Sequence, residues 1–500
     1  MKATMPIANK EEKRNVPPNK QAAIIVFAAA MAATMAFDVG AVVKTATPFA
    51  DNMVLQRGMA VPVWGTAETG ERVTVSFAGQ TKSTTADAAG KWLVTLDPMS
   101  ESAESRTLTV AGAANSEECR NVLVGEVWFA SGQSNMNFPI WGGNVRARDK
   151  DGEYMTSVTR RPLVRFVKNP QVASPDAPRL DWKAVWYDYS PESFKKSGYK
   201  LGAVAFYYAL ELYNALGIPV GIVESSWGGT YLSPWTPPSG FVGRSPVHHG
   251  DKPVVRASSL WNGMVAAWAP MAMRGFIWYQ GESEGMTGTD GRYCEEMHGI
   301  YNCWAKEFRN PGLKLYFAQL APWKRSWFKT HLEQARFAAE EKNAAMSVLC
   351  DAGNPYDIHP NNKQIVARRL ALHALRRDYG FTDIIDDSPT LKSCKVEDGK
   401  FILSFDNAKS WYYYNADRSE PRGFEIAGPD GKFMPAVIVN KDEKGNITGS
   451  ELVVKADGVA EPRKLRYLAA SLWIGSIYSF DSGLPLGPFE TRDPTERHIE

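Results

Sequence analysis

The amino-acid sequence predicts an α/β protein in which a mostly parallel sheet is flanked by two smaller β-rich domains. Between about residues 116 and 385, apolar strand-like runs alternate with helical segments. This order is typical of βαβ units, whose helices cover both faces of a parallel sheet. On either side, apolar and polar residues alternate with a period of two, as in half-buried antiparallel strands. We therefore expect a leader (1–43), an N-terminal β-domain (44–115), a central α/β domain (116–385) and a C-terminal β-domain (386–495).

The size and charge of the chain set the first limits on its function. Its 500 residues suggest about three domains, at roughly 150 residues each. A composition that is 44% hydrophobic and 22% charged is that of an ordinary globular protein. The net charge of +2 gives no electrostatic footprint for nucleic acid, so we expect no nucleic-acid partner. The oligomeric state is left open.

The N-terminal region contains an apolar stretch, residues 22–37, that follows several basic residues. The stretch is short for a membrane span, which needs about 20 apolar residues. A basic region followed by an apolar one resembles a signal peptide. We expect this leader to direct export to the periplasm or out of the cell, with no other membrane contact. An uncleaved anchor and a disordered tail are the alternatives.

Short strands are predicted in the N-terminal β-domain. Val73, Val75 and Phe77 alternate with polar residues, and glycines mark turns on either side. This pattern indicates a small β-sandwich. We expect its role to be structural. Carbohydrate binding is the alternative, although the sequence identifies no exposed aromatic platform.

The central domain begins with a strand over 122–130, followed later by a helix over 204–216 that ends at Gly217, a natural C-cap. Further strands are predicted over 219–224, 275–279, 315–320 and 346–350. The C-terminal region returns to alternation, with Phe401, Leu403 and Phe405 on one face of a strand. This alternation predicts a second small β-domain of the sandwich type.

The cysteines and histidines contain no familiar metal-binding motif. The five cysteines include no C-x-x-C pair, and the seven histidines include no H-E-x-x-H. Cys294 and Cys303 fall in a predicted helix, on opposite faces and ~13 Å apart along its axis, so we expect no disulfide between them. We therefore expect no metal and no cofactor.

One serine occupies a position suited to chemistry. The strand over 122–130 runs into the loop Ser131-Gly132-Gln133-Ser134-Asn135-Met136. In an open α/β sheet the reactive groups lie beyond the carboxyl ends of the strands, so Ser134 is a candidate nucleophile. Met136 replaces the second glycine of the G-x-S-x-G elbow, so the loop is not that motif. The alternative is that Ser134 is a turn residue or a helix N-cap.

Three further loops follow predicted strands and could meet Ser134 at the same edge of the sheet. They contain Gly228-Gly229, Gln280-Gly281-Glu282 and Asp357-Ile358-His359-Pro360. A serine nucleophile needs an adjacent base, and the base needs a group that fixes its tautomer. His359, two residues after Asp357, is the candidate base. The alternative is an ordinary surface or core histidine.

An oxyanion hole needs hydrogen-bond donors aimed at the developing negative charge. The backbone N–H of Ser134, that of Gly228 or Gly229, and the side-chain amide of Gln280 are the candidate donors. The alternatives are that the glycines only form a turn and that Gln280 only satisfies buried backbone groups.

Taken together, these loops resemble a known family. The segments 132–136, 227–230, 278–283 and 357–360 are similar to motifs of the sialate O-acetylesterase family of SGNH hydrolases, in the same order. The likeness extends to the β-domains through 53–58 and 483–485, so it covers residues ~47–490.

The resemblance implies a flavodoxin-like sheet, a metal-independent Ser-His mechanism and removal of acetyl groups from carbohydrate hydroxyls. It assigns Ser134 as nucleophile and His359 as base. Many SGNH enzymes place the acid three residues before the histidine, where this chain has Tyr356, so Asp357, Glu282 or a backbone carbonyl could orient His359. Glu284 stands where the family commonly has Asn.

We therefore expect an esterase that acts on an acetylated sugar or glycan through an acetyl-enzyme. Sialic acid, xylan, mannan and pectin esters are not separated by the sequence. Trp141, Trp235 and Trp323 are candidates for stacking on the sugar, or else core residues. The alternatives are a carbohydrate-binding protein without turnover and a lipase or thioesterase on the same fold.

Overall fold

A computed structural model of the chain describes residues 42–140, 160–198, 200–241, 245–246, 249–414, 421–471, 473–491 and 493. The chain divides into two compact units, Met1–Val42 and Val43–Glu500. The apolar stretch of the predicted leader lies outside the described residues, so its role in export stays a prediction. Within the described ranges, no helix is long and apolar enough to cross a membrane.

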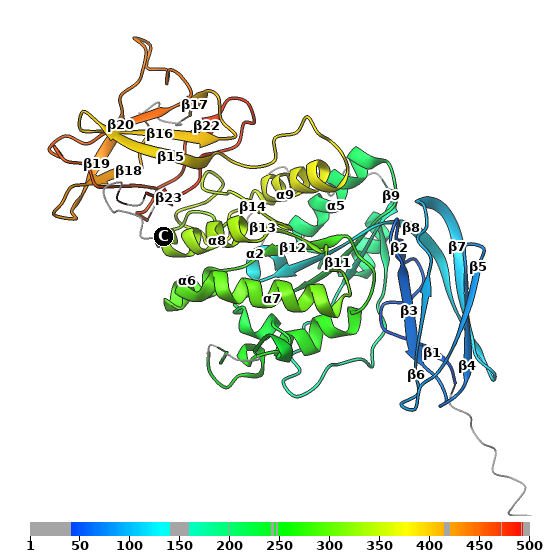
Figure 1. The fold of residues 1–500 in the computed structure, drawn as a ribbon. Coiled ribbons are helices and arrows are strands. Elements are labelled where there is room, and N and C mark those ends of the chain that lie inside the picture. The colour runs from blue at the N-terminus through cyan, green and yellow to red at the C-terminus, as the bar shows by residue number, and fades with distance from the viewer. Residues whose placement is uncertain are drawn as a thin grey trace, which may run out of the picture. The chain divides into compact units, whose positions relative to one another are not determined.

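The central sheet has the strand order β10-β9-β11-β8-β12-β13-β14 (Figure 1). These strands are β8 (Ser116–Gly132), β9 (Arg161–Lys168), β10 (Tyr187–Tyr189), β11 (Val220–Ser226), β12 (Gly275–Tyr279), β13 (Lys314–Ala318) and β14 (Ala344–Ser347). Neighbours are parallel, except that β10 runs antiparallel to β9. The five predicted strands are confirmed. They lie in the order β11-β8-β12-β13-β14, which is the 2-1-3-4-5 order of flavodoxin-like sheets.

Helices cover both faces of this sheet (Figure 1). On β12, Phe276 and Trp278 pack into one core with residues of α7 (Tyr293–Glu307) and α8 (Phe328–Glu340). Ile277 and Tyr279 pack into the other core with α5 (Ala203–Leu216) and α9 (Lys363–Asp378). Because β12 is buried on both faces, its sequence is a continuous apolar run.

The predicted central helix is α5, and it ends at Gly217 as expected. Gly217 adopts the left-handed conformation, with φ of 68°, and its N–H donates to the carbonyl of Tyr213. The shorter helices are α2 (Ser134–Asn137), α4 (Pro191–Lys196), α6 (Glu282–Thr287), η1 (Ser233–Trp235), η2 (Pro238–Phe241), η3 (Pro253–Val255), η4 (Trp261–Val265), η5 (Ala266–Trp268) and η6 (Asp290–Arg292).

The N-terminal β-domain consists of two sheets, one of which shares the long strand β8 with the central domain. One sheet contains β1 (Lys44–Thr45), β3 (Val61–Thr66) and β6 (Lys91–Leu96), and the other contains β4 (Arg72–Phe77), β5 (Gln80–Thr85), β7 (Ser102–Ala111) and the first half of β8. β2 (Val54–Gln56) pairs in parallel with the middle of β8. The second half of β8 then enters the central sheet and ends just before Ser134, so one strand joins this domain to the candidate site (Figure 1).

The C-terminal β-domain is built around a sheet in the order β15-β16-β20-β19-β18-β21-β23. β17 (Trp411–Tyr413) and β22 (Ile477–Ser479) form a separate two-stranded sheet. The strands of the larger sheet are β15 (Thr390–Glu397), β16 (Lys400–Asp406), β18 (Phe424–Ala427), β19 (Phe433–Ile438), β20 (Leu452–Lys455), β21 (Lys464–Tyr467) and β23 (Phe489–Glu490). Phe401, Leu403 and Phe405 point into one core, as their alternation predicts. The domain boundaries themselves stay predictions.

Candidate active site

The chain turns sharply where β8 ends, and this turn places Ser134 at the start of α2. Gly132 has φ of 134°, and a Cβ there would lie 2.2 Å from the carbonyl oxygen of Tyr279. Only glycine fits so close an approach of two strands. The N–H of Gln133 donates to that same carbonyl at 2.9 Å, which fixes the turn against the end of β12. Ser134 itself is half-buried.

The loop after β11 lies directly beside Ser134. The N–H of Trp227 donates to the carbonyl of Gly132 at 3.0 Å. A Cβ built on Gly228 would lie 3.3 Å from the Cβ of Ser134, so a larger residue would crowd the serine. Gly229 has φ of 74°, which favours glycine, and both glycines are exposed. The predicted convergence of these two loops is therefore observed.

Gln280 has a different environment from the one predicted for an oxyanion donor. Its side chain is completely buried, and its amide donates to the carbonyl of Thr230 at 3.0 Å and to Glu284 Oε2 at 2.5 Å. Both amide hydrogens are thus used inside the protein. The side chain holds the Gly228–Thr230 loop in place and does not present a donor to a bound substrate.

Glu284 lies beneath the same loop. It is buried, and its Oε1 accepts a hydrogen bond from the N–H of Leu232 at 2.7 Å. Burial raises the pKa of the Glu284 carboxyl to about 8, against the hydrogen bonds from Leu232 and Gln280 that lower it. The residue that replaces the family's Asn is therefore a buried support of the loop.

Asn135 connects Ser134 to the loops that contain Glu282 and His359. Its Nδ2 donates to Glu282 Oε1 at 2.5 Å and to the carbonyl of Ile358 at 3.1 Å. Its Oδ1 accepts from Lys363 Nζ at 2.5 Å. One side chain, next to the candidate nucleophile, thus joins three of the predicted loops.

Lys363 was not predicted as a site residue. It is 1% exposed, and its Nζ lies 5.6 Å from the ring centroid of Phe138 and 5.8 Å from that of Tyr279. Lys363 is the first residue of α9, where the helix dipole disfavours a cation. Because lysines are mostly solvent-exposed, no sequence signal identifies Lys363 as a site residue.

His359 lies beside Phe138, with ring centroids 5.6 Å apart. Burial lowers the pKa of the imidazole, and the charge of Lys363 lowers it further, against the opposing charge of Asp357. A lowered pKa keeps His359 neutral near pH 7, which is the form that accepts a proton. Among the described residues, no hydrogen bond joins the side chains of Ser134 and His359. Such bonds are often long in free enzymes and tighten with substrate.

The two carboxylates proposed to orient His359, Asp357 and Glu282, differ in their contacts. Asp357 Oδ1 lies 3.9 Å from His359 Nδ1, beyond hydrogen-bond distance, and accepts the backbone N–H of His359 at 2.9 Å. Glu282 accepts a hydrogen bond from the side-chain amide of Asn135. Burial raises the pKa of the Glu282 carboxyl, although that hydrogen bond lowers it. Tyr356 is 92% exposed. Asp357 is therefore the carboxylate nearest to Nδ1 by the contacts seen, and it also shapes the turn.

The tryptophans predicted to stack on a sugar have different positions. Trp235 is completely buried, and its Nε1 donates to Thr230 Oγ1 at 3.1 Å, so the stacking prediction is wrong for it. Trp323 is half-buried and stacks on Trp327 with ring centroids 5.6 Å apart. Trp141 lies outside the described residues.

A cavity of about 600 Å³ adjoins α2 on the side of β9 and β10. It is lined by Asn137, Pro139, Lys168, Asn169, Pro170, Gln171, Trp182, Lys183, Val185, Tyr187, Lys196, Ser197, Gly198 and Lys200. Lys168 Nζ donates to Asn137 Oδ1 at 2.7 Å and to Glu224 Oε1 at 2.5 Å, and Gln171 Nε2 donates to the carbonyl of Ser226 at 2.9 Å. Its size is that of a small-molecule site, and its lining mixes amides, lysines and aromatic rings.

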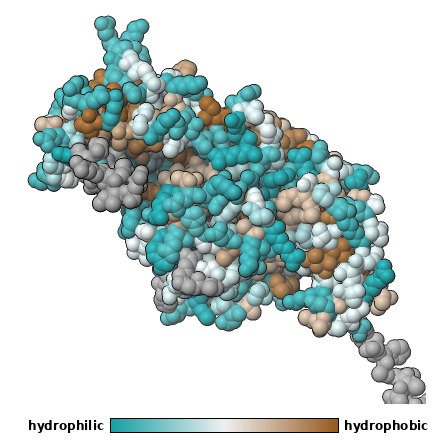
Figure 2. Space-filling model, in the orientation of Figure 1, coloured by the Kyte–Doolittle hydropathy of each residue, from teal (hydrophilic) through white to brown (hydrophobic). Residues whose placement is uncertain are grey.

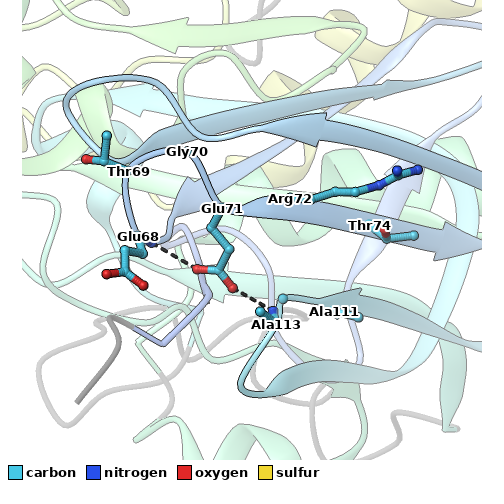
Figure 3. A pocket seen from close by; sticks show the side chains of 9 residues that line it. Glu68, Thr69, Gly70, Glu71, Arg72, Thr74, Ala111 and Ala113 are labelled. Carbon is cyan, nitrogen blue, oxygen red and sulfur yellow. Dashed lines mark hydrogen bonds between the residues drawn. The ribbon is translucent and has the colours of Figure 1, made fainter. Parts of the chain in front are cut away.

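A second depression, of about 530 Å³, lies in the N-terminal β-domain (Figure 3). Glu71 lines it and accepts hydrogen bonds from the N–H groups of Glu68 at 3.0 Å and Ala113 at 2.7 Å. No aromatic side chain lines it. The depression therefore gives no aromatic platform for carbohydrate binding by this domain.

A family model, curated relatives and a solved structure that match this chain are described as esterases. Residues 124–364 match the family model described as "Carbohydrate esterase, sialic acid-specific acetylesterase". The sialate O-acetylesterases of Homo sapiens and Rattus norvegicus are 26% and 25% identical, over 75% and 78% of this chain and 78% and 84% of their own lengths. A crystal structure of a carbohydrate acetylesterase from Xanthomonas citri is 30% identical, with a TM-score of 0.78, and the match covers 90% of this chain and 99% of that one.

Proposed function

Because the chain belongs to the sialate O-acetylesterase family of carbohydrate esterases, we propose that it removes O-acetyl groups from sugar hydroxyls with Ser134 as the nucleophile. The observation that carries this proposal is the set of hydrogen bonds of Asn135. They hold the Ser134 turn against the carbonyl of Ile358, the residue before His359, and against Glu282. A nucleophile and a base that come from distant parts of the chain are thereby kept together.

In the proposed first step, His359 accepts the proton of Ser134 as Oγ attacks the acetyl carbonyl carbon. The backbone N–H of Ser134 and that of Gly228 or Gly229 stabilise the oxyanion. The intermediate then collapses, the bond to the sugar oxygen breaks, and protonated His359 returns its proton to the sugar hydroxyl. His359 next deprotonates a water that attacks the acetyl-enzyme, which releases acetate and free Ser134.

Gln280 acts differently in this proposal from the sequence-based expectation. Because both amide hydrogens of Gln280 hold Thr230 and Glu284, we assign the residue to positioning the Gly228–Gly229 turn. The oxyanion donors are then backbone groups alone. Such donors are held rigidly and need no reorganisation during the reaction.

The cavity beside α2 is the proposed place for the sugar. It begins at Asn137, three residues after Ser134, and its amide and lysine side chains suit a hydroxyl-rich ligand. A long acyl chain would need an apolar groove instead. On the face seen in Figure 2, hydrophobic residues lie in small patches separated by hydrophilic ones. The polar lining of the cavity favours a sugar ester over the lipase or thioesterase alternative.

The first test compares acetate release from a chromogenic acetyl ester by the wild type and Ser134→Ala. We expect kcat to fall by roughly a thousandfold or more, as when the nucleophile of a triad is removed. Ser100→Ala, which changes an exposed serine of the N-terminal domain, should match the wild type. Equal rates in wild type and Ser134→Ala would contradict the proposal. Binding of an acetylated glycan without acetate release would then favour the carbohydrate-binding alternative.

The natural substrate is a separate question. The mammalian relatives are named for sialate esters, and the Xanthomonas citri relative for carbohydrate esters in general. We propose an acetylated sugar or glycan as substrate. Acetate release from O-acetylated sialic acid, acetylxylan, acetylmannan and acetylated pectin would separate the candidates. Release from acetylxylan alone would rule out sialate as the substrate.

We also propose that the protein acts outside the cytoplasm, because residues 22–37 have the order of a signal peptide. Expression of the full chain with a C-terminal tag, followed by cell fractionation, tests this. Full-length protein in the cytoplasmic fraction would contradict export.

A further inference from the structure

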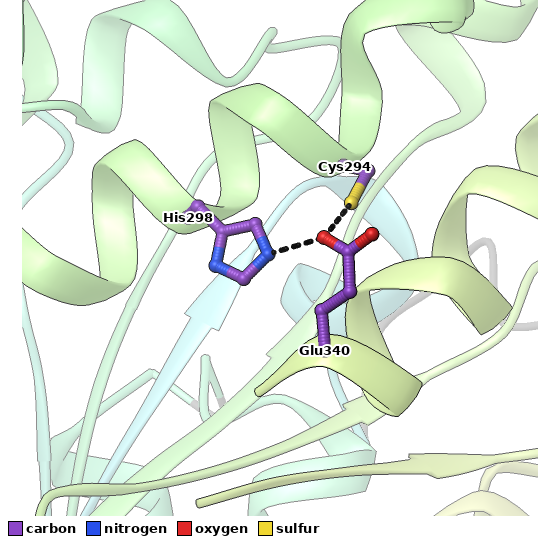
Figure 4. A group of neighbouring side chains, drawn as sticks. All are labelled: Cys294, His298 and Glu340. Atoms are coloured by element: carbon purple, nitrogen blue, oxygen red, sulfur yellow. Dashed lines mark hydrogen bonds and ion pairs between the residues drawn. The ribbon is translucent and has the colours of Figure 1, made fainter. Parts of the chain in front are cut away.

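The helices α7 and α8 bring three potential metal-binding side chains together (Figure 4). Cys294 and His298 lie one turn apart on α7, and Glu340 lies at the end of α8. Cys294 Sγ lies 3.5 Å from Glu340 Oε2, and His298 Nε2 lies 3.0 Å from the same oxygen. The three ligand atoms are all within 4.8 Å of one another. We propose that Cys294, His298 and Glu340 form a site for Zn²⁺.

The separations fit one tetrahedral ion. Zinc bonds of about 2.0–2.3 Å place neighbouring ligand atoms about 3.3–3.6 Å apart. The separations of Glu340 Oε2 from Cys294 Sγ and from His298 Nε2 are close to that range. The remaining pair, Sγ and Nε2, lies within 4.8 Å and needs at most about 1.2 Å of closure, which side-chain rotation can supply. A thiolate and an imidazole select zinc over Mg²⁺ or Ca²⁺.

The surroundings support the ligands and balance the charge. Arg336 Nε donates to Glu340 Oε1 at 2.8 Å, which leaves Oε2 turned toward Cys294 and His298. Such a second contact orients a metal ligand. Arg336 also lies 3.9 Å from Glu333. When Cys294 loses its thiol proton to solvent on binding, the charges of the thiolate, the two glutamates, Arg336 and Zn²⁺ cancel.

Partial exposure leaves a fourth position open to water. Cys294 is buried, while the side chains of His298 and Glu340 are 28% and 43% exposed. An ion can therefore reach the site from solvent, and water can complete the tetrahedron. In the absence of metal, the thiol and imidazole both hydrogen-bond to Oε2, so the cluster needs no ion to fold.

The site would join the two helices that support Gln280. Tyr293, the residue before Cys294, donates its hydroxyl to the carbonyl of Gln280 at 2.8 Å. Gln334 of α8 donates Nε2 to the same carbonyl at 3.3 Å. An ion bound between α7 and α8 would hold both donors and thereby stabilise the loop beside Ser134. We infer a stabilising role for the metal, separate from the Ser-His chemistry.

The test uses the full-length protein after removal of metals with a chelator and dialysis. Isothermal titration with Zn²⁺ should show one saturable site in the wild type. Titration with Co²⁺ should show the near-ultraviolet absorption of a thiolate-to-metal charge transfer. Cys294→Ser should abolish that absorption and weaken Zn²⁺ binding by at least about tenfold. Mutation of a residue that only orients a metal ligand already costs about 10–100-fold in metal affinity. Zn²⁺ should raise the Tm of the wild type but not of the variant.

Cys303→Ser is the matched control, because Cys303 lies on the same helix and its thiol faces Ser239, at 3.7 Å, rather than the cluster. It should bind as the wild type does. Glu340→Gln, at an exposed helix end, should lose binding and decides the question if Cys294→Ser does not fold. The absence of saturable Zn²⁺ binding, equal binding by the wild type and Glu340→Gln, or loss of the absorption in Cys303→Ser would each overturn the proposal.

Discussion

Lys363 places a buried positive charge next to the residues that carry the proposed chemistry. Its charge and the burial of the imidazole both lower the pKa of His359. We expect Lys363→Met to raise that pKa, so that His359 becomes protonated at a higher pH. Because only the neutral imidazole accepts the proton of Ser134, the acid limb of the kcat/KM profile should move to higher pH. The measurement is kcat/KM for a chromogenic acetyl ester as a function of pH.

Lys363→Met also leaves Asn135 Oδ1 without its donor, so kcat should fall as well. Lys363→Arg separates the two effects, because it keeps the charge while it changes the hydrogen-bond geometry. The acid limb should stay near its wild-type position in Lys363→Arg. An unmoved acid limb in Lys363→Met would mean that this charge does not tune His359.

Asp357 is the proposed partner of His359 although its nearest oxygen lies 3.9 Å from Nδ1. We expect Asp357→Ala to lower kcat by about 10²-fold or more, the usual scale for acid–base assistance. Tyr356→Phe, in the same turn, is the control, since Tyr356 is exposed. If Glu282→Gln lowers kcat more than Asp357→Ala does, the buried glutamate is the partner.

At the residue scale, the sequence brought out Ser134 and His359 because each follows a strand and each has a recognisable neighbour. Their catalytic roles stay predictions. Asn135 and Lys363 contribute to the candidate site through a hydrogen bond between their side chains, and the two residues are 228 positions apart in the sequence. No local pattern encodes such a pair, and a lysine at a helix start is usually solvent-exposed.

At the scale of elements, α6 supports the loop that contains Gly228 and Gly229 through the buried carboxyl of Glu284, which accepts hydrogen bonds from Leu232 and Gln280. Burial raises the pKa of Glu284 to about 8, above the usual value for an unfolded chain. At a pH between the usual glutamate pKa and pH 8, the Glu284 carboxyl has lost its proton in the unfolded state and keeps it in the native state. Stability should therefore fall as the pH rises through this window, by at most about 1.4 kcal/mol per pH unit.

Glu284→Gln tests this expectation, since its side chain does not titrate. Urea unfolding gives the free energy of unfolding of the wild type and the variant from pH 5 to pH 8. As the pH rises, the free energy of the variant should increase relative to that of the wild type. Glu341→Gln, which removes a carboxyl at the end of α8, is the control and should track the wild type. A constant difference between wild type and Glu284→Gln would contradict the raised pKa.

The elements themselves were predicted best where burial made the sequence uniformly apolar. The strands β8 and β12 have two buried faces, and their runs of apolar residues identified them. β9 is buried over its central residues only and contains Arg161, Arg165 and Lys168, which hide its apolar pattern. Arg165 can be buried because its guanidinium donates to the carbonyls of Pro162 and Asn52. Such a solution is visible only in three dimensions.

For the molecule as a whole, β8 carries one buried carboxylate where the N-terminal β-domain meets the central sheet. Glu126 is completely buried and accepts hydrogen bonds from Arg57 and Arg274 and from Gln56 and Tyr379. These donors come from the end of β2, the start of β12 and the end of α9. Burial raises the pKa of Glu126, but the hydrogen bonds and charge of Arg274 outweigh it and hold the pKa below its usual value.

We therefore expect Glu126→Gln to lower the free energy of unfolding by about 3–5 kcal/mol, the usual cost of removing one partner from a buried ion pair. Glu118→Gln is the control, since Glu118 lies on the same strand in an exposed pair with Arg120 and should cost less than about 1 kcal/mol. Because the lowered pKa makes the contribution of Glu126 disappear in acid, the difference in the free energy of unfolding between wild type and Glu126→Gln should shrink as the pH falls.

Hydrogen exchange tests whether β8 couples the two parts of the molecule. In Glu126→Gln, native-state hydrogen exchange should show β7 and β12 losing protection together, since β8 pairs with both. Loss of protection in β7 alone would mean that the strand does not couple the N-terminal domain to the sheet that holds Ser134.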